Sequence, residues 1–138
     1  YKRQDFGGAI SLIGYDLSAP TAAAGDSLTL NLYWQANAPD GNDYTVFVHL
    51  LNPSGAIVAQ HDAPPQNGNY PTSIWAAGEF IADRHTLRLP PDLPAGSYTL
   101  AAGLYRPRDS SRLPVSLAGQ PVPDGQAMIG AVEVIRGN

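Results

Sequence analysis

The chain has 138 residues, a net charge of −4 and no cysteine, so it forms neither a disulfide nor a thiolate metal site. Only 14% of the residues are charged, and the acidic excess argues against a nucleic-acid groove, which needs clustered Lys and Arg. No apolar run reaches the roughly 18 residues of a membrane span, whereas a hydrophobic fraction of 43% suffices for one folded core.

The first residues are predicted to lie outside the folded domain. We expect residues 1–8 to be a residual linker and residues 9–138 to form a single β-sandwich domain. Because the chain begins at Tyr1 rather than at Met, we expect it to be a fragment of a longer protein.

Alternating apolar and polar residues predict strands along most of the chain. Leu28, Leu30, Leu32 and Trp34 alternate with polar or aromatic neighbours, which is typical of a half-buried strand. Ten of the 12 acidic residues are Asp, which favours turns over helices. The fold class is therefore all-β, an immunoglobulin-like or fibronectin-III-like β-sandwich of seven to eight antiparallel strands. The predicted strands are residues 9–17, 28–35, 44–51, 56–61, 79–89, 98–104 and 127–135, with a shorter one at 113–117.

One turn carries a specific signal. The segment from Leu93 to Tyr98 has the L-x-x-G-x-Y spacing of a tyrosine corner. In that motif a Tyr at the start of a strand turns its hydroxyl back to the backbone a few residues upstream. We therefore expect Tyr98 to fix the connection between the two sheets.

The three histidines raise the question of a metal site. Asp83 and His85 share a strand face with Leu87 and Leu89, which places them near the margin of the core. Phe80 and Ala82 have the opposite parity, which predicts a bulge near Ala82. His49 and His61 lie on other predicted strands. These side chains either form a structural hydrogen-bond network or hold an ion, and no ligand spacing favours the ion. The acidic turn at residues 40–43 is interpreted as a solvated loop rather than a calcium site.

A short motif resembles the nucleophile block of an esterase superfamily. Gly25-Asp26-Ser27-Leu28 matches that block, but a predicted strand follows it instead of the helix that such a serine needs. A serine hydrolase that uses Ser27 is therefore the least favoured alternative.

The connection over residues 62–78 is long for a compact domain and contains aromatic residues among prolines and glycines. Tyr70 and Trp75 of this segment, together with Tyr105, are the predicted ligand-binding residues of a carbohydrate-binding module, because aromatic faces stack on sugar rings. In the alternative interpretation, Trp75 folds back and covers Phe47 and Leu51.

At these residues the chain resembles the β-sandwich domain appended to bacterial multi-pass membrane proteins of the dolichyl-phosphate-mannose glycosyltransferase type. The resemblance rests on several stretches that together span most of the chain: GYDL at 14–17, GDSLTLNLYWQA at 25–36, DYTVFVHLLNPSGAIVAQHDAPP at 43–65, PT at 71–72 with Trp75 and Gly78-Glu79, Asp83 with His85, residues 93–105, and RLPV at 112–115. It implies an extracytoplasmic accessory domain, whose family's catalytic carboxylates belong to the absent membrane portion.

The functional expectation is therefore a non-catalytic binding or spacer domain, located outside the cytoplasm or at the cell surface as part of a membrane-anchored protein. Its expected partners are a glycan or the rest of the parent membrane protein, with no nucleic acid and no direct membrane insertion. We expect a monomer or weak dimer, with no catalytic residue, no metal and no cofactor. The alternatives are the carbohydrate-binding module and the hydrolase.

Overall fold

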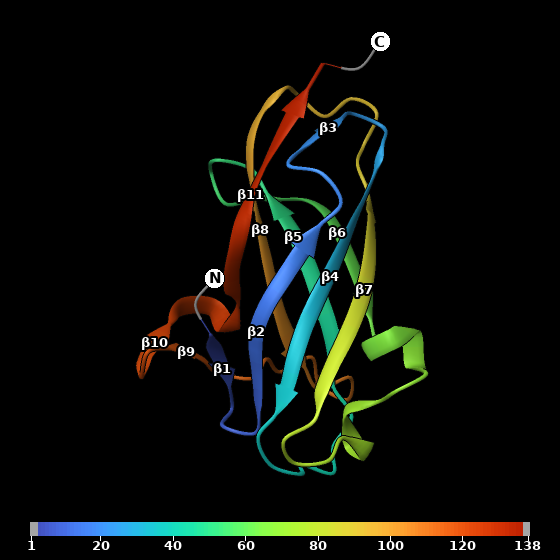
Figure 1. Ribbon diagram of the computed structural model, residues 1–138. Helices are drawn as coiled ribbons and strands as arrows, with labels where there is room; N and C mark the ends of the chain where they lie inside the picture. Colours follow the sequence, from blue (N-terminus) through green and yellow to red (C-terminus); the bar gives the residue numbers. More distant parts are fainter. Residues whose placement is uncertain (1–2, 137–138) are drawn as a thin grey trace.

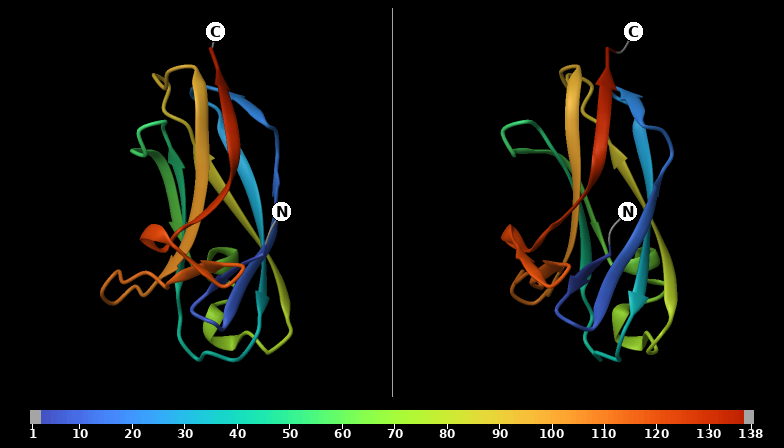
Figure 2. Two further views of the ribbon diagram at one scale, coloured as in Figure 1. Left: turned by 90° about the vertical axis from the view of Figure 1, so that its left-hand side faces the viewer. Right: turned by 60° about the vertical axis from the view of Figure 1, so that its left-hand side comes forward.

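The computed structural model describes residues 3–136, which form two sheets packed face to face (Figures 1 and 2). The six-stranded sheet has the order β10–β9–β1–β2–β4–β7, with bounds Gln120–Val122, Val115–Leu117, Gln4–Phe6, Ile10–Leu17, Ser27–Ala36 and Phe80–Arg88. The five-stranded sheet has the order β3–β11–β8–β5–β6, with bounds Thr21–Ala23, Ala127–Ile135, Gly96–Tyr105, Thr45–Leu51 and Ile57–Ala63. Three short 3-10 turns, η1 Pro65–Gly68, η2 Thr72–Ile74 and η3 Pro123–Gly125, interrupt the connections.

The predicted all-β sandwich is confirmed. All strand pairs are antiparallel except β3 with β11, which run parallel. The core lies between the sheets, where the alternating row of β4 from Leu28 to Trp34 meets Val46, Val48 and Leu50 of β5; each of these side chains is at most 1% exposed. The period-2 pattern therefore identified the inner faces correctly, because only one side of each strand faces the other sheet.

The predicted linker at residues 1–8 is wrong where the structure describes it. Residues 4–6 form β1, which pairs with β2 on one side and β9 on the other. Phe6 is fully buried, and its ring meets the edge of Trp34 with a centroid separation of 5.3 Å. A strand of three residues is too short to show a period, so hydrophobic pattern could not identify it. Residues 1 and 2 lie outside the described residues.

The predicted bulge near Ala82 is also wrong. β7 pairs with β4 in unbroken register from Phe80 opposite Gln35 to Arg88 opposite Ser27. Ile81 is buried, whereas the side chain of Phe80 is 66% exposed and lies on the outer face of the sheet. The prediction failed because an exposed aromatic residue was assigned to the core.

Asp83 and His85 lie in the core rather than at its margin. The Asp83 carboxylate accepts hydrogen bonds from the backbone N–H of Gln66 at 2.8 Å and the indole N–H of Trp34 at 3.3 Å. It also lies 2.6 Å from Nε2 of His85, whose Nδ1 is 3.0 Å from Nδ1 of His61. β6 and β7 are the edge strands of the two sheets, so this chain of polar groups joins the sheets along one open side. A buried carboxylate with this many partners is satisfied rather than reactive.

Among residues 3–136, no helix has the length and the apolar character that crossing a membrane requires.

The tyrosine corner is present and yields a stability prediction. Tyr98 is buried, and its hydroxyl donates a hydrogen bond of 2.7 Å to the carbonyl of Pro94. Tyr98→Phe is expected to lower the free energy of unfolding by about 1 kcal/mol, the usual net value of one such bond. Urea denaturation measures the change. Tyr33→Phe is the control, because the Tyr33 hydroxyl bonds Asp16 in an exposed setting and its loss should matter less. Equal losses in both variants would contradict the assignment.

The facing histidines predict pH-dependent stability. Burial first, and then the neighbouring His85, lower the pKa of His61 below its usual 6.5. The unfolded chain therefore takes up the proton before the folded chain does, and the free energy of unfolding should decrease as the pH falls below about 6.5. Thermal unfolding at pH 7.5, 6.5 and 5.5 measures this. In His61→Gln the slope should be shallower, and an unchanged slope would show that another group is responsible. Some dependence should remain, because burial also lowers the pKa of His49.

Candidate binding site on the outer face of the five-stranded sheet

The outer face of the five-stranded sheet carries large side chains beside very small ones. β5 directs Phe47 and His49 outward, since Val46, Val48 and Leu50 point into the core. On the β8 side, Phe47 lies opposite Gly103 and His49 opposite Ala101. On the β6 side, the same two residues lie opposite Asp62 and Gln60. Three adjacent strands therefore supply one continuous surface.

This surface contains a cavity of about 300 Å³. It is lined by residues of β5, β6 and β8 and of the connection that follows β8: Phe47, His49, Ile57, Gln60, Asp62, Tyr105, Ser110 and Arg112. The lining combines aromatic, amide, carboxylate, hydroxyl and guanidinium groups, which is the mixture that polar organic ligands require.

The floor of the cavity depends on Phe47 and on the missing side chain of Gly103. A Cβ atom at position 103 would lie 2.3 Å from Cζ of Phe47 and 2.8 Å from the carbonyl oxygen of Gly125. The glycine therefore lets the phenyl ring lie against β8. The guanidinium of Arg112 covers the ring, with Cζ 4.4 Å from the ring centroid, in a cation–π contact.

His49 is the one buried side chain with an unsatisfied polar atom among those the structure describes. The residue is only 5% exposed, and its Nδ1 has no hydrogen-bond partner. Burial lowers the pKa of His49, Asp62 opposes that shift, and Arg112 reinforces it, so the imidazole is neutral near pH 7. An unpartnered buried nitrogen costs stability, and His49 lines the cavity, although Nδ1 itself has less than 1 Å² of accessible surface.

Asp62 and Tyr105 also line the cavity. The Tyr105 hydroxyl donates a 3.0 Å hydrogen bond to Oδ2 of Asp62, which joins β8 to β6 across β5. Burial, and then this bond, raise the pKa of Tyr105, so the phenol keeps its proton. The Tyr105 ring also stacks near Phe47, with centroids 6.3 Å apart.

The connection from β8 to β9 contributes Ser110 and Arg112 to the cavity and is held by a hydrogen-bonded turn. The backbone N–H of Arg106 bonds the carbonyl of Ser111 at 2.8 Å, and the N–H of Ser110 bonds the carbonyl of Arg106 at 2.8 Å. Tyr105 and Arg112 form an isolated bridge at its base. These bonds place Arg112 over Phe47. The connection belongs to the orange segment that leaves the five-stranded sheet near its lower end in Figure 2.

Of the three aromatic residues predicted to bind a ligand, only Tyr105 lines this cavity. Trp75 is 3% exposed, belongs to the core, and donates its indole N–H to the carbonyl of Tyr70 at 2.9 Å. Its ring faces are therefore closed to a sugar, and the proposed stacking role is corrected. Tyr70 is partly buried against the core, and its hydroxyl bonds Glu79. Trp75 does fold inward, as the alternative interpretation held, but it packs in the core rather than over Phe47.

Sequence reasoning did not identify His49, Gln60, Asp62 and Arg112 as one site. The alternation along the strand shows that His49 and Phe47 share one face of the sheet. The contribution of Arg112 depends on the course of an irregular connection, which the sequence pattern does not give. Three arginines between residues 106 and 112 were the signal that could have drawn attention to it.

The other candidate motifs have local structural roles. Ser27 begins strand β4 rather than a helix, so it lacks the helix N-terminus that such a nucleophile uses. In the turn at residues 40–43, Asp40 accepts a bond from the Tyr44 hydroxyl at 2.7 Å, and Asp43 accepts one from the N–H of Ser73 at 3.1 Å. Within residues 3–136, no group of three His, Asp or Glu side chains is arranged to hold a metal ion.

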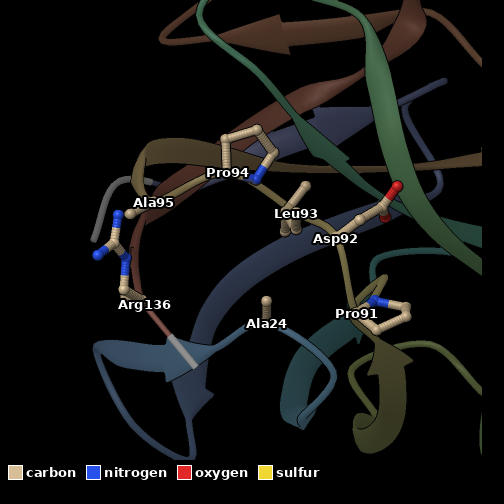
Figure 3. A pocket seen from close by; sticks show the side chains of 7 residues that line it. All are labelled: Ala24, Pro91, Asp92, Leu93, Pro94, Ala95 and Arg136. Atoms are coloured by element: carbon tan, nitrogen blue, oxygen red, sulfur yellow. The ribbon is translucent and has the colours of Figure 1, made fainter. Parts of the chain in front are cut away.

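A second cavity, of about 660 Å³, lies at the other end of the sandwich (Figure 3). The turn from Pro91 to Ala95 forms most of its wall, with Ala24 and Arg136 completing it. Figure 3 shows Arg136 and Asp92 on different sides of the hollow. This cavity is larger, but it adjoins the tyrosine corner, and none of its lining side chains is among the described ones with an unpartnered buried polar atom. The His49 cavity is therefore the better candidate.

The packing of Phe47 on Gly103 yields a test of the cavity. Gly103→Ala is expected to lower the free energy of unfolding by about 1–3 kcal/mol, the cost of overpacking a close contact. Gly14→Ala is the matched control, since the nearest atom to an added Cβ there is Cδ2 of Tyr33 at 4.0 Å. Chemical denaturation measures both. Equal stability of the two variants would show that the Phe47 ring does not need the space above Gly103.

Comparison with models of protein families finds no match, and comparison with curated proteins finds none either. Solved structures show the fold. The C-terminal domain of wzt aligns with a TM-score of 0.67 at 13% identity, covering 99% of this chain and 80% of that chain. A Niemann-Pick type C2 protein from the Japanese carpenter ant aligns at 0.52 and 8% identity, covering 90% and 91%. A calcium-binding mutant of Bacteroides uniformis beta-glucuronidase 2 aligns at 0.51 and 18% identity, covering 83% of this chain and 14% of that much longer one. The chain thus has the fold of β-sandwich domains, the wzt domain being one part of a larger protein.

Proposed function

We propose that this chain is a non-catalytic accessory domain that binds carbohydrate on the outer face of its five-stranded sheet. The single observation that carries the proposal is a cavity whose lining combines aromatic side chains with amide, carboxylate, hydroxyl and guanidinium groups. The carboxylate–histidine pair of the chain, Asp83 and His85, is enclosed in the core, which favours binding over catalysis.

The chemistry of the cavity suits a sugar. Hydroxyl groups donate and accept hydrogen bonds, so they can bond both the amide of Gln60 and the carboxylate of Asp62. The partly exposed ring of Tyr105 offers an apolar face to the C–H side of a pyranose. A rigid sheet holds these groups in place, which limits the entropy lost on binding.

The biological setting is the one that the sequence resemblance implies. We propose an extracytoplasmic position within a larger membrane-anchored protein of the glycosyltransferase-like kind, where the domain would hold a glycan close to the parent. A passive spacer is the alternative, and the binding experiment decides between them.

We expect neutral and acidic monosaccharides, titrated to millimolar concentration, to shift the amide resonances of β5, β6 and β8 in ¹H–¹⁵N spectra. His49→Phe should abolish the response, because it removes the unpartnered nitrogen while keeping an aromatic ring. The same variant should unfold at equal or higher urea concentration, since it removes a buried unsatisfied group worth about 1 kcal/mol or more.

His49→Asn is the matched control, because its side-chain amide offers both a donor and an acceptor and should keep part of the binding. Shifts confined to the turn from Pro91 to Ala95 would place binding in the other cavity and refute the site. No shift with any sugar would leave the spacer function.

A further inference from the structure

We infer that the saccharide bound at the His49 cavity is acidic and that Arg112 binds its carboxylate; this inference rests on the proposed function. It adds a ligand class to the site and assigns the recognition of charge to one residue.

The segment beside the cavity is rich in positive charge, although the chain as a whole is negatively charged. The chain carries a net charge of −4, yet three of its eight basic residues, Arg106, Arg108 and Arg112, lie within the β8–β9 connection, residues 106–114. Asp109 is the acidic residue of that segment, and its carboxylate accepts the backbone N–H of Ser111 at 3.0 Å. That bond ties the aspartate to its own turn.

Arg112 is held in place but its charge is unpaired. The residue is exposed, and its guanidinium lies over the Phe47 ring. Its described hydrogen bond runs from Nη1 to the backbone carbonyl of Asp124 at 2.8 Å. Within residues 3–136, no carboxylate forms an ion pair with it. A guanidinium has five N–H donors in a planar fork that matches a carboxylate, so donors remain for a ligand.

The remaining lining groups specify a sugar rather than a bare anion. Asp62 carries negative charge into the same cavity, which disfavours a small multivalent anion. Its carboxylate and the Gln60 amide instead suit ligand hydroxyl groups. A uronic acid presents a carboxylate and several hydroxyls on one ring, so it can bond Arg112 through the carboxylate and Asp62 and Gln60 through the hydroxyls.

The experiment compares D-glucuronate with D-glucose at pH 7.5, since the two differ at one carbon. Isothermal titration should show D-glucuronate binding at least about tenfold more tightly, the ratio expected for one charge-assisted contact. In Arg112→Gln most of this preference should disappear while weak binding of D-glucose remains. Arg112→Lys keeps the charge without the planar fork and should recover only part of the preference.

Arg108→Gln is the matched control, because it removes a charge from the same connection without touching the cavity lining. If it lowers the preference as much as Arg112→Gln does, general attraction rather than a site is responsible, and the inference fails. Equal affinities of the wild type for both sugars would also overturn it while leaving the proposed function intact. Inorganic sulfate or phosphate binding as tightly as D-glucuronate would indicate a simple anion site. Failure of both sugars to bind would remove the proposed function as well.

Discussion

The contact between Phe47 and Gly103 determines the character of the outer face. An ordinary exposed sheet face carries separate polar side chains, each surrounded by water. Here the missing Cβ lets an aromatic ring lie on the neighbouring strand, and the ring in turn supports the guanidinium of Arg112. The β8–β9 connection is thereby fixed against the sheet, and His49 next to the ring becomes buried although it points away from the core. A cavity with rigid walls is the result.

The histidines of this domain illustrate two opposite uses of a buried imidazole. His85 lies between Asp83 and His61, and this chain of polar groups joins the two edge strands of the sandwich. His49 has an unpartnered nitrogen in a cavity wall. The first arrangement contributes to stability because its groups satisfy one another, whereas the second costs stability unless something binds. This contrast is the physical basis for distinguishing a structural cluster from a binding site in a chain without a metal motif or a catalytic motif.

Sequence pattern predicted the sandwich because a strand that faces the other sheet on one side must alternate, as β4 and β5 do. The tyrosine corner was predictable because its spacing is local. β1 was not predictable, since three residues are too few to show an alternating pattern. Phe80 was assigned to the inner face because aromatic residues are usually buried, whereas its side chain is exposed. The candidate site draws on positions 49, 62, 105 and 112, which only strand register and an irregular connection bring together. Trp75 also lies in an irregular connection, whose course the sequence pattern does not give, so it was predicted to bind a ligand although it packs in the core. Similarity to solved structures adds the fold and no ligand, because the identities are low.

The central claim is that the cavity lined by His49 binds a sugar and that the His49 imidazole senses it. Long-range ¹H–¹⁵N correlation spectra of the imidazole, recorded with and without saturating D-glucuronate, observe its Nδ1 directly. The account predicts that the Nδ1 resonance of His49 moves on addition of the sugar, while those of His61 and His85 stay in place. A His49 signal that does not respond, in a protein whose other resonances show that the sugar is bound, would contradict it.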